Sequence, residues 1–233
     1  MRLRLLHLAI LTTLAAVHLS DPLKAQESDS NHRAGLLGRE YAEAQYIHLF
    51  AQDELEPLDG SLNGARGSIN IPVPWTTELL QVISQDIFLA ADYLQISESL
   101  APLGISGTFD AHISRVALGT TLFADVTNDF RPFVQLGYQS VGSSATFNAG
   151  GFSFKEKDVT ESMLLVIGSE VDLTERMAFR TAIDCELEEQ FKDSMLTAEL
   201  IHWFGRYVFV RGGFVTDLQA EGFGAVAGGG VAW

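Results

Sequence analysis

The chain has 233 residues, with 15 Lys or Arg and 30 Asp or Glu side chains, so its net charge is −15. A protein this acidic repels nucleic-acid phosphates, and we expect no nucleic-acid partner. Its single cysteine, Cys185, excludes an intrachain disulfide and a cysteine-based metal cluster. Beyond the N-terminal run, no segment approaches the roughly 20 apolar residues that a membrane helix requires.

Residues 1–25 have the pattern of a secretory signal peptide. The basic start Met1-Arg2-Leu3-Arg4 precedes an apolar run, and small Ala25 ends the segment. We therefore expect export and cleavage before Gln26. Residues 26–38 are predicted to form a polar N-terminal tail, and residues 39–233 a single folded domain.

From residue 39 onward, apolar and polar residues alternate with period two, between clusters of Gly, Pro, Asn and Asp. This pattern predicts ten strands, at 39–51, 63–75, 85–97, 107–123, 130–144, 159–173, 175–189, 193–204, 206–217 and 221–233. Eight strands are the alternative count. Pro72 and Pro74 weaken the second strand because neither residue donates a backbone hydrogen bond.

A soluble β-sandwich would show the same alternation with its apolar face turned inward. Three features favour a membrane barrel instead. Long and short connections alternate, aromatic residues gather at one end of the strands, and an even strand count allows closure without sheet edges. We therefore predict an all-β, antiparallel, up-and-down transmembrane β-barrel.

Aromatic residues at the expected periplasmic ends of the strands predict a girdle at the lipid headgroups. Its expected members are Trp75, Phe130, Phe133, Trp203, Phe204, Tyr207 and Trp233. The last strand carries Phe223, Val231 and Trp233 at period two, with Gly and Ala on the other face.

The signal peptide, the alternating segments and the terminal Val231-Ala232-Trp233 together resemble the small outer-membrane β-barrel proteins of Gram-negative-type bacteria, the OmpA-like and OmpX-like group. The resemblance implies location in the bacterial outer membrane and contact with its lipid. It also implies recognition of Phe223, Val231 and Trp233 by the barrel-assembly machinery. We expect no periplasmic domain, and the oligomeric state is open.

The polar faces of the strands predict a charged lumen. Its expected members are Arg39, Glu43, Arg66, Asp92, Arg115, Glu170, Arg180, Asp184, Glu186, Glu199 and Arg211. In a narrow barrel such a set forms an ion-pair network that fills the interior. The alternative is a porin-like pore whose surplus of carboxylates favours cations.

His112 and Ser114 share one strand face, in a pattern similar to the His-x-Ser pair of outer-membrane lipid A deacylases. Residues two apart on any strand share a face, so a barrel hydrolase is the weaker alternative. No spacing of His residues predicts a metal site, and no motif predicts a cofactor. We expect a non-enzymatic barrel that is a structural or narrow diffusion element.

Overall fold

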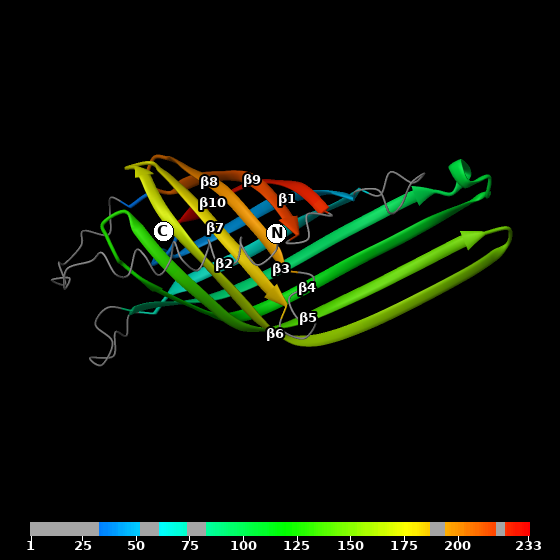
Figure 1. Cartoon of the computed structure of the whole chain (residues 1–233), viewed down its shortest axis with the longest axis horizontal. Coiled ribbons are helices and arrows are strands. Elements are labelled where there is room, and N and C mark those ends of the chain that lie inside the picture. Colours follow the sequence, from blue (N-terminus) through cyan, green and yellow to red (C-terminus); the bar gives the residue numbers. More distant parts are fainter. Residues whose placement is uncertain (1–32, 52–60, 74–82, 187–193, 218–221) are drawn as a thin grey trace, which may run out of the picture.

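The computed structural model describes residues 33–51, 61–73, 83–186, 194–217 and 222–233. Ten strands form a closed barrel (Figure 1). They are β1 (Tyr41–Ala51), β2 (Leu62–Pro72), β3 (Ile83–Ser99), β4 (Gly107–Ala124), β5 (Phe130–Ala149), β6 (Phe152–Thr174), β7 (Met177–Glu186), β8 (Met195–Phe204), β9 (Val208–Asp217) and β10 (Gly222–Ala232), with one 3-10 turn, η3 (Ala101–Leu103), between β3 and β4.

Every neighbouring pair of strands is antiparallel, and β1 pairs with β10 from Tyr41↔Ala232 to Ala51↔Gly222. Closure leaves no long unpaired edge around the barrel wall. The prediction of a ten-stranded up-and-down barrel is therefore confirmed. The start of β1 and the end of β10 lie at one end, which we call the terminal end; the opposite end is the far end.

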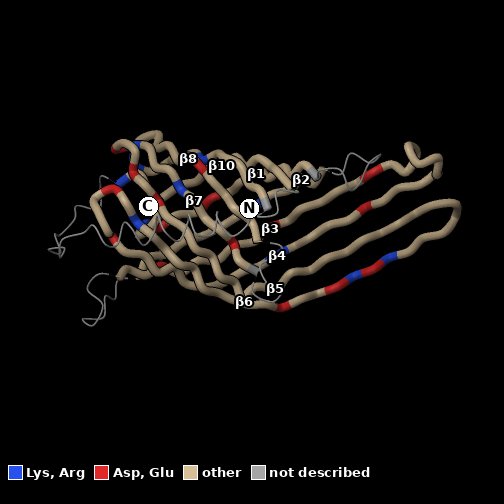
Figure 2. The backbone as a smooth tube through the Cα atoms, in the orientation of Figure 1, with Lys and Arg blue, Asp and Glu red and all other residues tan. Residues whose placement is uncertain are grey.

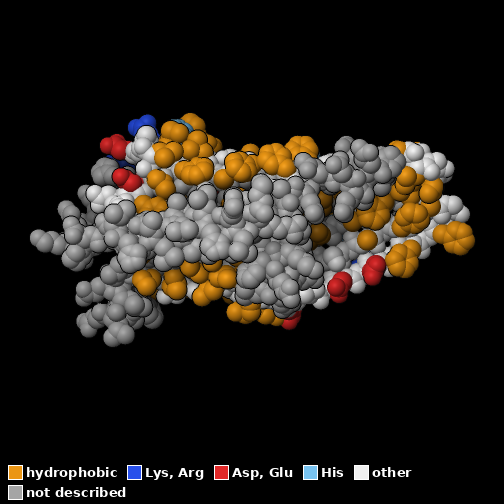
Figure 3. Space-filling model, in the orientation of Figure 1, with side chains coloured by type: hydrophobic (Ala, Val, Ile, Leu, Met, Phe, Trp, Pro, Cys, Tyr) orange, Lys and Arg blue, Asp and Glu red, His pale blue; other side chains and the backbone are white. Residues whose placement is uncertain are grey.

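Successive residues of each strand point alternately into and out of the barrel. On β5, for example, Arg131, Phe133 and Gln139 are buried in the interior, whereas Leu136 and Tyr138 are exposed on the outside. The same alternation places large apolar side chains along the outer surface, where Figure 3 shows them over the barrel. The outer wall is therefore apolar and the inner wall is largely polar.

Strands β3 to β6 are 17 to 23 residues long, whereas the other strands have 10 or 11. The additional residues of β3, β4, β5 and β6 extend past the far end as one sheet (Figure 1), which we call the projection. It contains residues 95–99 of β3, 107–114 of β4, 140–149 of β5 and 152–161 of β6.

Residues 145–158, which lie between two of the predicted strands, mostly belong to β5 and β6. Only Gly150 and Gly151 form the turn, with φ of 57° and 85°, and the residues around them are paired strands. Two glycines at positive φ are the usual composition of a tight two-residue hairpin turn. The apolar pair Phe147↔Phe154 continues the ladder toward this turn.

Proline ends β2 earlier than predicted. The strand stops at Pro72, although the backbone N–H of Val73 still donates to the Gln85 carbonyl at 2.8 Å. Trp75 and the predicted strand residues 187–189 lie outside the described residues. Among the residues that are described, no helix is long and apolar enough to cross a membrane.

Candidate functional site in the barrel interior

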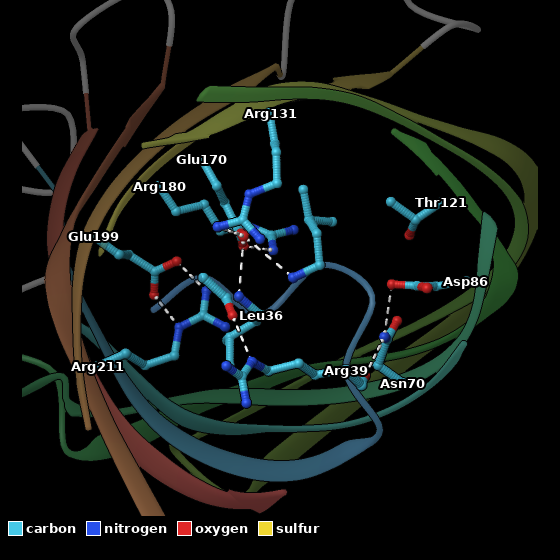
Figure 4. A network of polar contacts seen from close by, with 12 residues as sticks. Leu36, Arg39, Asn70, Asp86, Thr121, Arg131, Glu170, Arg180, Glu199 and Arg211 are labelled. Carbon is cyan, nitrogen blue, oxygen red and sulfur yellow. Dashed lines mark hydrogen bonds and ion pairs between the residues drawn. The ribbon is translucent and has the colours of Figure 1, made fainter. Parts of the chain in front are cut away.

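Residues 33–38 lie inside the barrel at its terminal end, and we call them the N-terminal segment. Ala34 and Leu36 are fully buried and pack in one apolar cluster with Trp203 and Phe209 (Figure 4 shows Leu36 within the lumen). This corrects the expectation that the polar tail continues to residue 38. Burial of these apolar side chains against the inner wall removes them from water, which favours their position inside.

Glu170 on β6 holds the backbone of this segment. Its Oε2 accepts hydrogen bonds from the N–H groups of Leu36 and Leu37, at 3.0 and 3.2 Å, while its Oε1 accepts one from Arg180 at 2.8 Å. Glu170 has no exposed surface, so its charge depends on these donors for stabilisation. Asp86 similarly accepts the Gly38 N–H at 2.9 Å.

Trp203 on β8 and Arg39, which directly follows the segment, make further contacts with it. The Trp203 indole N–H donates to the Ala34 carbonyl at 2.6 Å, and the Arg39 guanidinium lies 4.6 Å from the centre of the Trp203 ring. Arg39 also donates to the carbonyls of Gly35 and Arg33. The segment is therefore bound through its backbone from several strands.

Gly35 passes close to the fully buried Arg131. A Cβ at this position would lie 2.2 Å from Arg131 Nη2 and 2.3 Å from Glu170 Oε2. Any larger residue would displace one of these charged groups. Arg131 itself pairs with Asp172 at 2.6 Å and lies 3.9 Å from Glu170 Oε2.

We call the charges around the N-terminal segment, which are Arg39, Arg131, Glu170, Asp172 and Arg180, the first layer. A second layer is formed by residues of β1, β8 and β9. Arg211 on β9 donates to Glu43 on β1 at 2.8 Å and to Glu199 on β8. Gln45 donates to the same Glu199 at 2.9 Å. Because each buried charge has an opposite charge within hydrogen-bond distance, the layer forms one connected network.

A third layer lies nearer the far end. Asp92 on β3 accepts hydrogen bonds from Arg66 on β2 and Arg115 on β4, at 2.8 and 2.6 Å. Arg115 also reaches Asp184 on β7 at 2.8 Å, although β5 and β6 separate these two strands in the wall. This ion pair therefore spans part of the lumen.

Ten of the predicted lumen residues lie in these three layers. They are Arg39, Glu43, Arg66, Asp92, Arg115, Glu170, Arg180, Asp184, Glu199 and Arg211. Glu186 ends β7, and its side chain is outside the described part of the chain. Arg131 is a further lumen residue that was not predicted, although it shares a face of β5 with the polar residues Gln135 and Gln139.

Two members of the predicted aromatic girdle lie inside the barrel. Phe133 and Trp203 are only 2% and 4% exposed; Phe133 packs beneath the Arg180 guanidinium, 4.4 Å from its ring centre. Their assignment to the outer surface was therefore wrong. Each lies an even number of residues from an inward polar residue, Gln135 or Glu199, and strand alternation required it to face inward.

The other described aromatics of this set lie outside. Phe204, Tyr207 and Trp233 are exposed, and Phe130 is half-buried. Trp75 lies in a part of the chain that is not described. On β10, the residues expected to carry the assembly signal, Phe223, Val231 and Trp233, are all exposed.

His112 and Ser114 both face outward on β4, and each has a partner other than its neighbour. The His112 ring stacks on Tyr93, with 5.8 Å between ring centres, and the Ser114 hydroxyl donates to the Gly142 carbonyl at 3.4 Å. Within the described ranges, no hydrogen bond joins His112 to Ser114, and no three His, Cys, Asp or Glu side chains are grouped to hold a metal.

Neither a protein-family model nor a curated protein sequence matches the chain. The solved structures similar to it include Ail of Yersinia pestis in complex with the heparin analogue sucrose octasulfate, at 10% identity and a TM-score of 0.43 over 84% of this chain and 99% of Ail. The transport unit of the Escherichia coli autotransporter AIDA-I has 8% identity and a TM-score of 0.48 over 97% of each chain. Omp33 of Acinetobacter baumannii has 15% identity and a TM-score of 0.35 over 84% of this chain and all of Omp33.

The structure of this chain itself combines a closed antiparallel barrel, an apolar outer wall and a charged inner wall. Closure satisfies the backbone groups that an open sheet would leave unpaired in lipid. Alternation of apolar-out and polar-in is the pattern of barrels that span the outer membrane. The chain therefore has the fold of the small outer-membrane β-barrel proteins.

Proposed function

We propose that the protein is a structural barrel of the outer membrane, with a lumen closed by its own side chains and N-terminal segment. In this role the barrel anchors the projection outside the cell. The observation that carries the proposal is that residues 33–38 lie inside the barrel, where their backbone is hydrogen-bonded to Glu170, Asp86 and Trp203.

The outer wall supports a position across the membrane. On β5 the outward side chains are apolar or aromatic from Phe130 to Tyr138, and outward Ser140 follows. Nine residues are close to the 9–11 that a tilted transmembrane strand of about 30 Å hydrocarbon needs. We place the terminal end in the periplasm, where Phe204, Tyr207 and Trp233 would contact lipid headgroups. The expected partners are outer-membrane lipid and, during biogenesis, the barrel-assembly machinery.

The three charged layers support a closed lumen. Arg131, Arg211 and Arg115 are each paired with two carboxylates. An ion passing through would have to displace several of these pairs, each of which compensates a buried charge. We therefore expect slow or absent ion flow through the intact protein.

Conductance in a planar bilayer tests this proposal. We expect the refolded mature protein to give no stable current steps. Deletion of residues 26–38 should open the terminal end and produce steps, whereas deletion of 26–32, which leaves the described segment in place, should not. Stable current through the parent protein would overturn the closed-lumen proposal.

A cation-preferring channel is the second candidate. It is favoured by the composition of the interior, where Asp86 and Asp172 add to the carboxylates of the three layers. Under this alternative the parent itself would conduct and would prefer cations. We propose no hydrolase activity at His112 and Ser114. We expect lipid hydrolysis by the purified protein, and by its Ser114→Ala variant, to equal that of a blank.

A further inference from the structure

The inner face of the projection carries a row of aromatic side chains. Strand pairing places Phe109 on β4 opposite Phe147 on β5, and Phe147 opposite Phe154 on β6. Phe152 lies next to this row, at the tip. All four share the face that points into the lumen further down the same strands, because the register is continuous.

This aromatic row is exposed. Phe152, Phe154 and Phe147 have 82%, 62% and 38% of their surface accessible, and Ile113 on the same face of β4 is also exposed. Figure 3 shows hydrophobic side chains gathered at the end of the projection, beyond the apolar wall of the barrel. Contiguous apolar surface outside the lipid is typical of an interaction site.

Carboxylates border this apolar face on both sides. Glu98 on β3 pairs with Phe109 across the sheet, and Glu156 and Asp158 lie on β6, at the other side. The lysines of this run, Lys155 and Lys157, point to the opposite face of the sheet by strand alternation. Figure 2 shows the run of alternating charges on β6.

The dimensions of the face fit an α-helix. Three strand spacings separate β3 from β6, which is about 14 Å, close to the diameter of a helix with its side chains. Gly107 and Ile113 are six positions apart on β4, so the apolar part extends for about 20 Å, the length of a helix of about 13 residues.

We propose that the inner face of the projection binds a cationic amphipathic α-helix of about 13 residues. Its apolar side would contact the Phe109, Phe147 and Phe154 row, and Lys or Arg residues flanking that side would pair with Glu98 on one border and Glu156 and Asp158 on the other. This binding activity goes beyond the anchoring role proposed above. Charge disfavours a polyanion, which would meet these acids, and a second copy docked through the same face, which would place carboxylates against carboxylates.

The test uses the full mature protein in nanodiscs of zwitterionic lipid. The probe is a fluorescent 14-residue peptide of Leu, Phe and Lys, designed as an amphipathic helix with lysines flanking its apolar side. Anisotropy with empty nanodiscs measures adsorption to lipid, which is subtracted. We expect saturable binding to the protein that weakens as salt is raised.

Two double variants divide the site into its apolar and acidic parts. We expect Phe147→Ser with Phe154→Ser to weaken peptide binding at least tenfold, and Glu156→Gln with Asp158→Asn to weaken it severalfold and reduce its salt dependence. The matched control is Lys155→Gln with Lys157→Gln, on the same strand but the other face, which should not weaken binding. Heat-dependent gel mobility verifies that each variant has a closed barrel.

Three results would overturn the proposal. One is equal binding of a matched peptide with Glu in place of Lys, and another is unchanged binding by the Phe147 and Phe154 variant. The third is an equal loss in the Lys155 and Lys157 control. Should the double Phe variant not assemble, Phe152→Ser at the tip should weaken binding by a smaller factor, and unchanged binding there would also oppose the proposal.

Discussion

Arg115 on β4 and Asp184 on β7 form an ion pair, with 2.8 Å between Nη1 and Oδ2, across two intervening strands. Arg115 also pairs with Asp92, one strand away. Backbone hydrogen bonds join only adjacent strands, so this side-chain pair links parts of the wall that the sheet itself does not. This ion pair opposes flattening of the barrel's cross-section, and it narrows the lumen where it crosses.

Replacing Arg115 by Ala should destabilise the barrel. The change leaves Asp92, which is 8% exposed, with Arg66 as its remaining cationic partner, and frees Asp184. We expect a loss of roughly 3 kcal/mol in the free energy of unfolding, the lower limit for breaking a buried pair, because Arg115 is partly exposed. Denaturant unfolding of the refolded protein measures this loss. Lys157→Ala, on the exposed projection, is the control and should change stability by less than about 0.5 kcal/mol.

A charged residue on the outer wall should destabilise the barrel more than a smaller apolar residue at the same position. Ile183 faces outward on β7, opposite Ile167 on β6. We expect Ile183→Arg to lower stability in lipid by about 2 to 4 kcal/mol, because the guanidinium would enter hydrocarbon. Ile183→Val, measured in the same unfolding experiment, should cost about 1 kcal/mol or less. Equal stability of the two variants would show that this face is in water.

A side chain at Gly35 should displace the N-terminal segment from the lumen. In Gly35→Val the new Cβ would overlap the Arg131 guanidinium and the Glu170 carboxylate. Trp203 would then lose its contact with Ala34 and become accessible to acrylamide. Quenching is measured in a variant with Trp75→Phe and Trp233→Phe, so that only Trp203 emits. Gly67→Ala is the control, because a Cβ there meets only the Glu43 carbonyl oxygen, at 3.8 Å. Unchanged quenching in Gly35→Val would contradict the placement of the segment.

The sequence predicted the strands well because they depend on local period-two alternation. The same alternation put the charged residues of the expected lumen on one face of each strand. The partners of each charge could not be predicted, since Glu43 meets Arg211 only when the first and last strands close the barrel. The N-terminal segment is a similar case. Glu170 receives the N–H groups of Leu36 and Leu37 from more than 130 residues away. Nothing local in the sequence around Glu170 indicates that contact.

The position of Trp203 was predictable in principle and was nevertheless wrong. Its place at a strand end suggested the headgroup girdle, while alternation from inward Glu199 required the interior. Alternation was the stronger constraint, because a one-residue slip would have turned every side chain of β8 to the other face. Inside the barrel the indole N–H also obtains the Ala34 carbonyl as a hydrogen-bond partner.

The two tryptophans should therefore respond oppositely to quenchers in lipid. Trp233 is 62% exposed on the outer wall, whereas Trp203 is 4% exposed inside. We prepare Trp75→Phe with Trp203→Phe, which leaves Trp233, and Trp75→Phe with Trp233→Phe, which leaves Trp203. In bilayers of brominated lipid we expect strong quenching of Trp233 and little quenching of Trp203, because bromine quenches over short distances in the hydrocarbon. Comparable quenching of both would place Trp203 on the lipid face and restore the girdle that the sequence suggested.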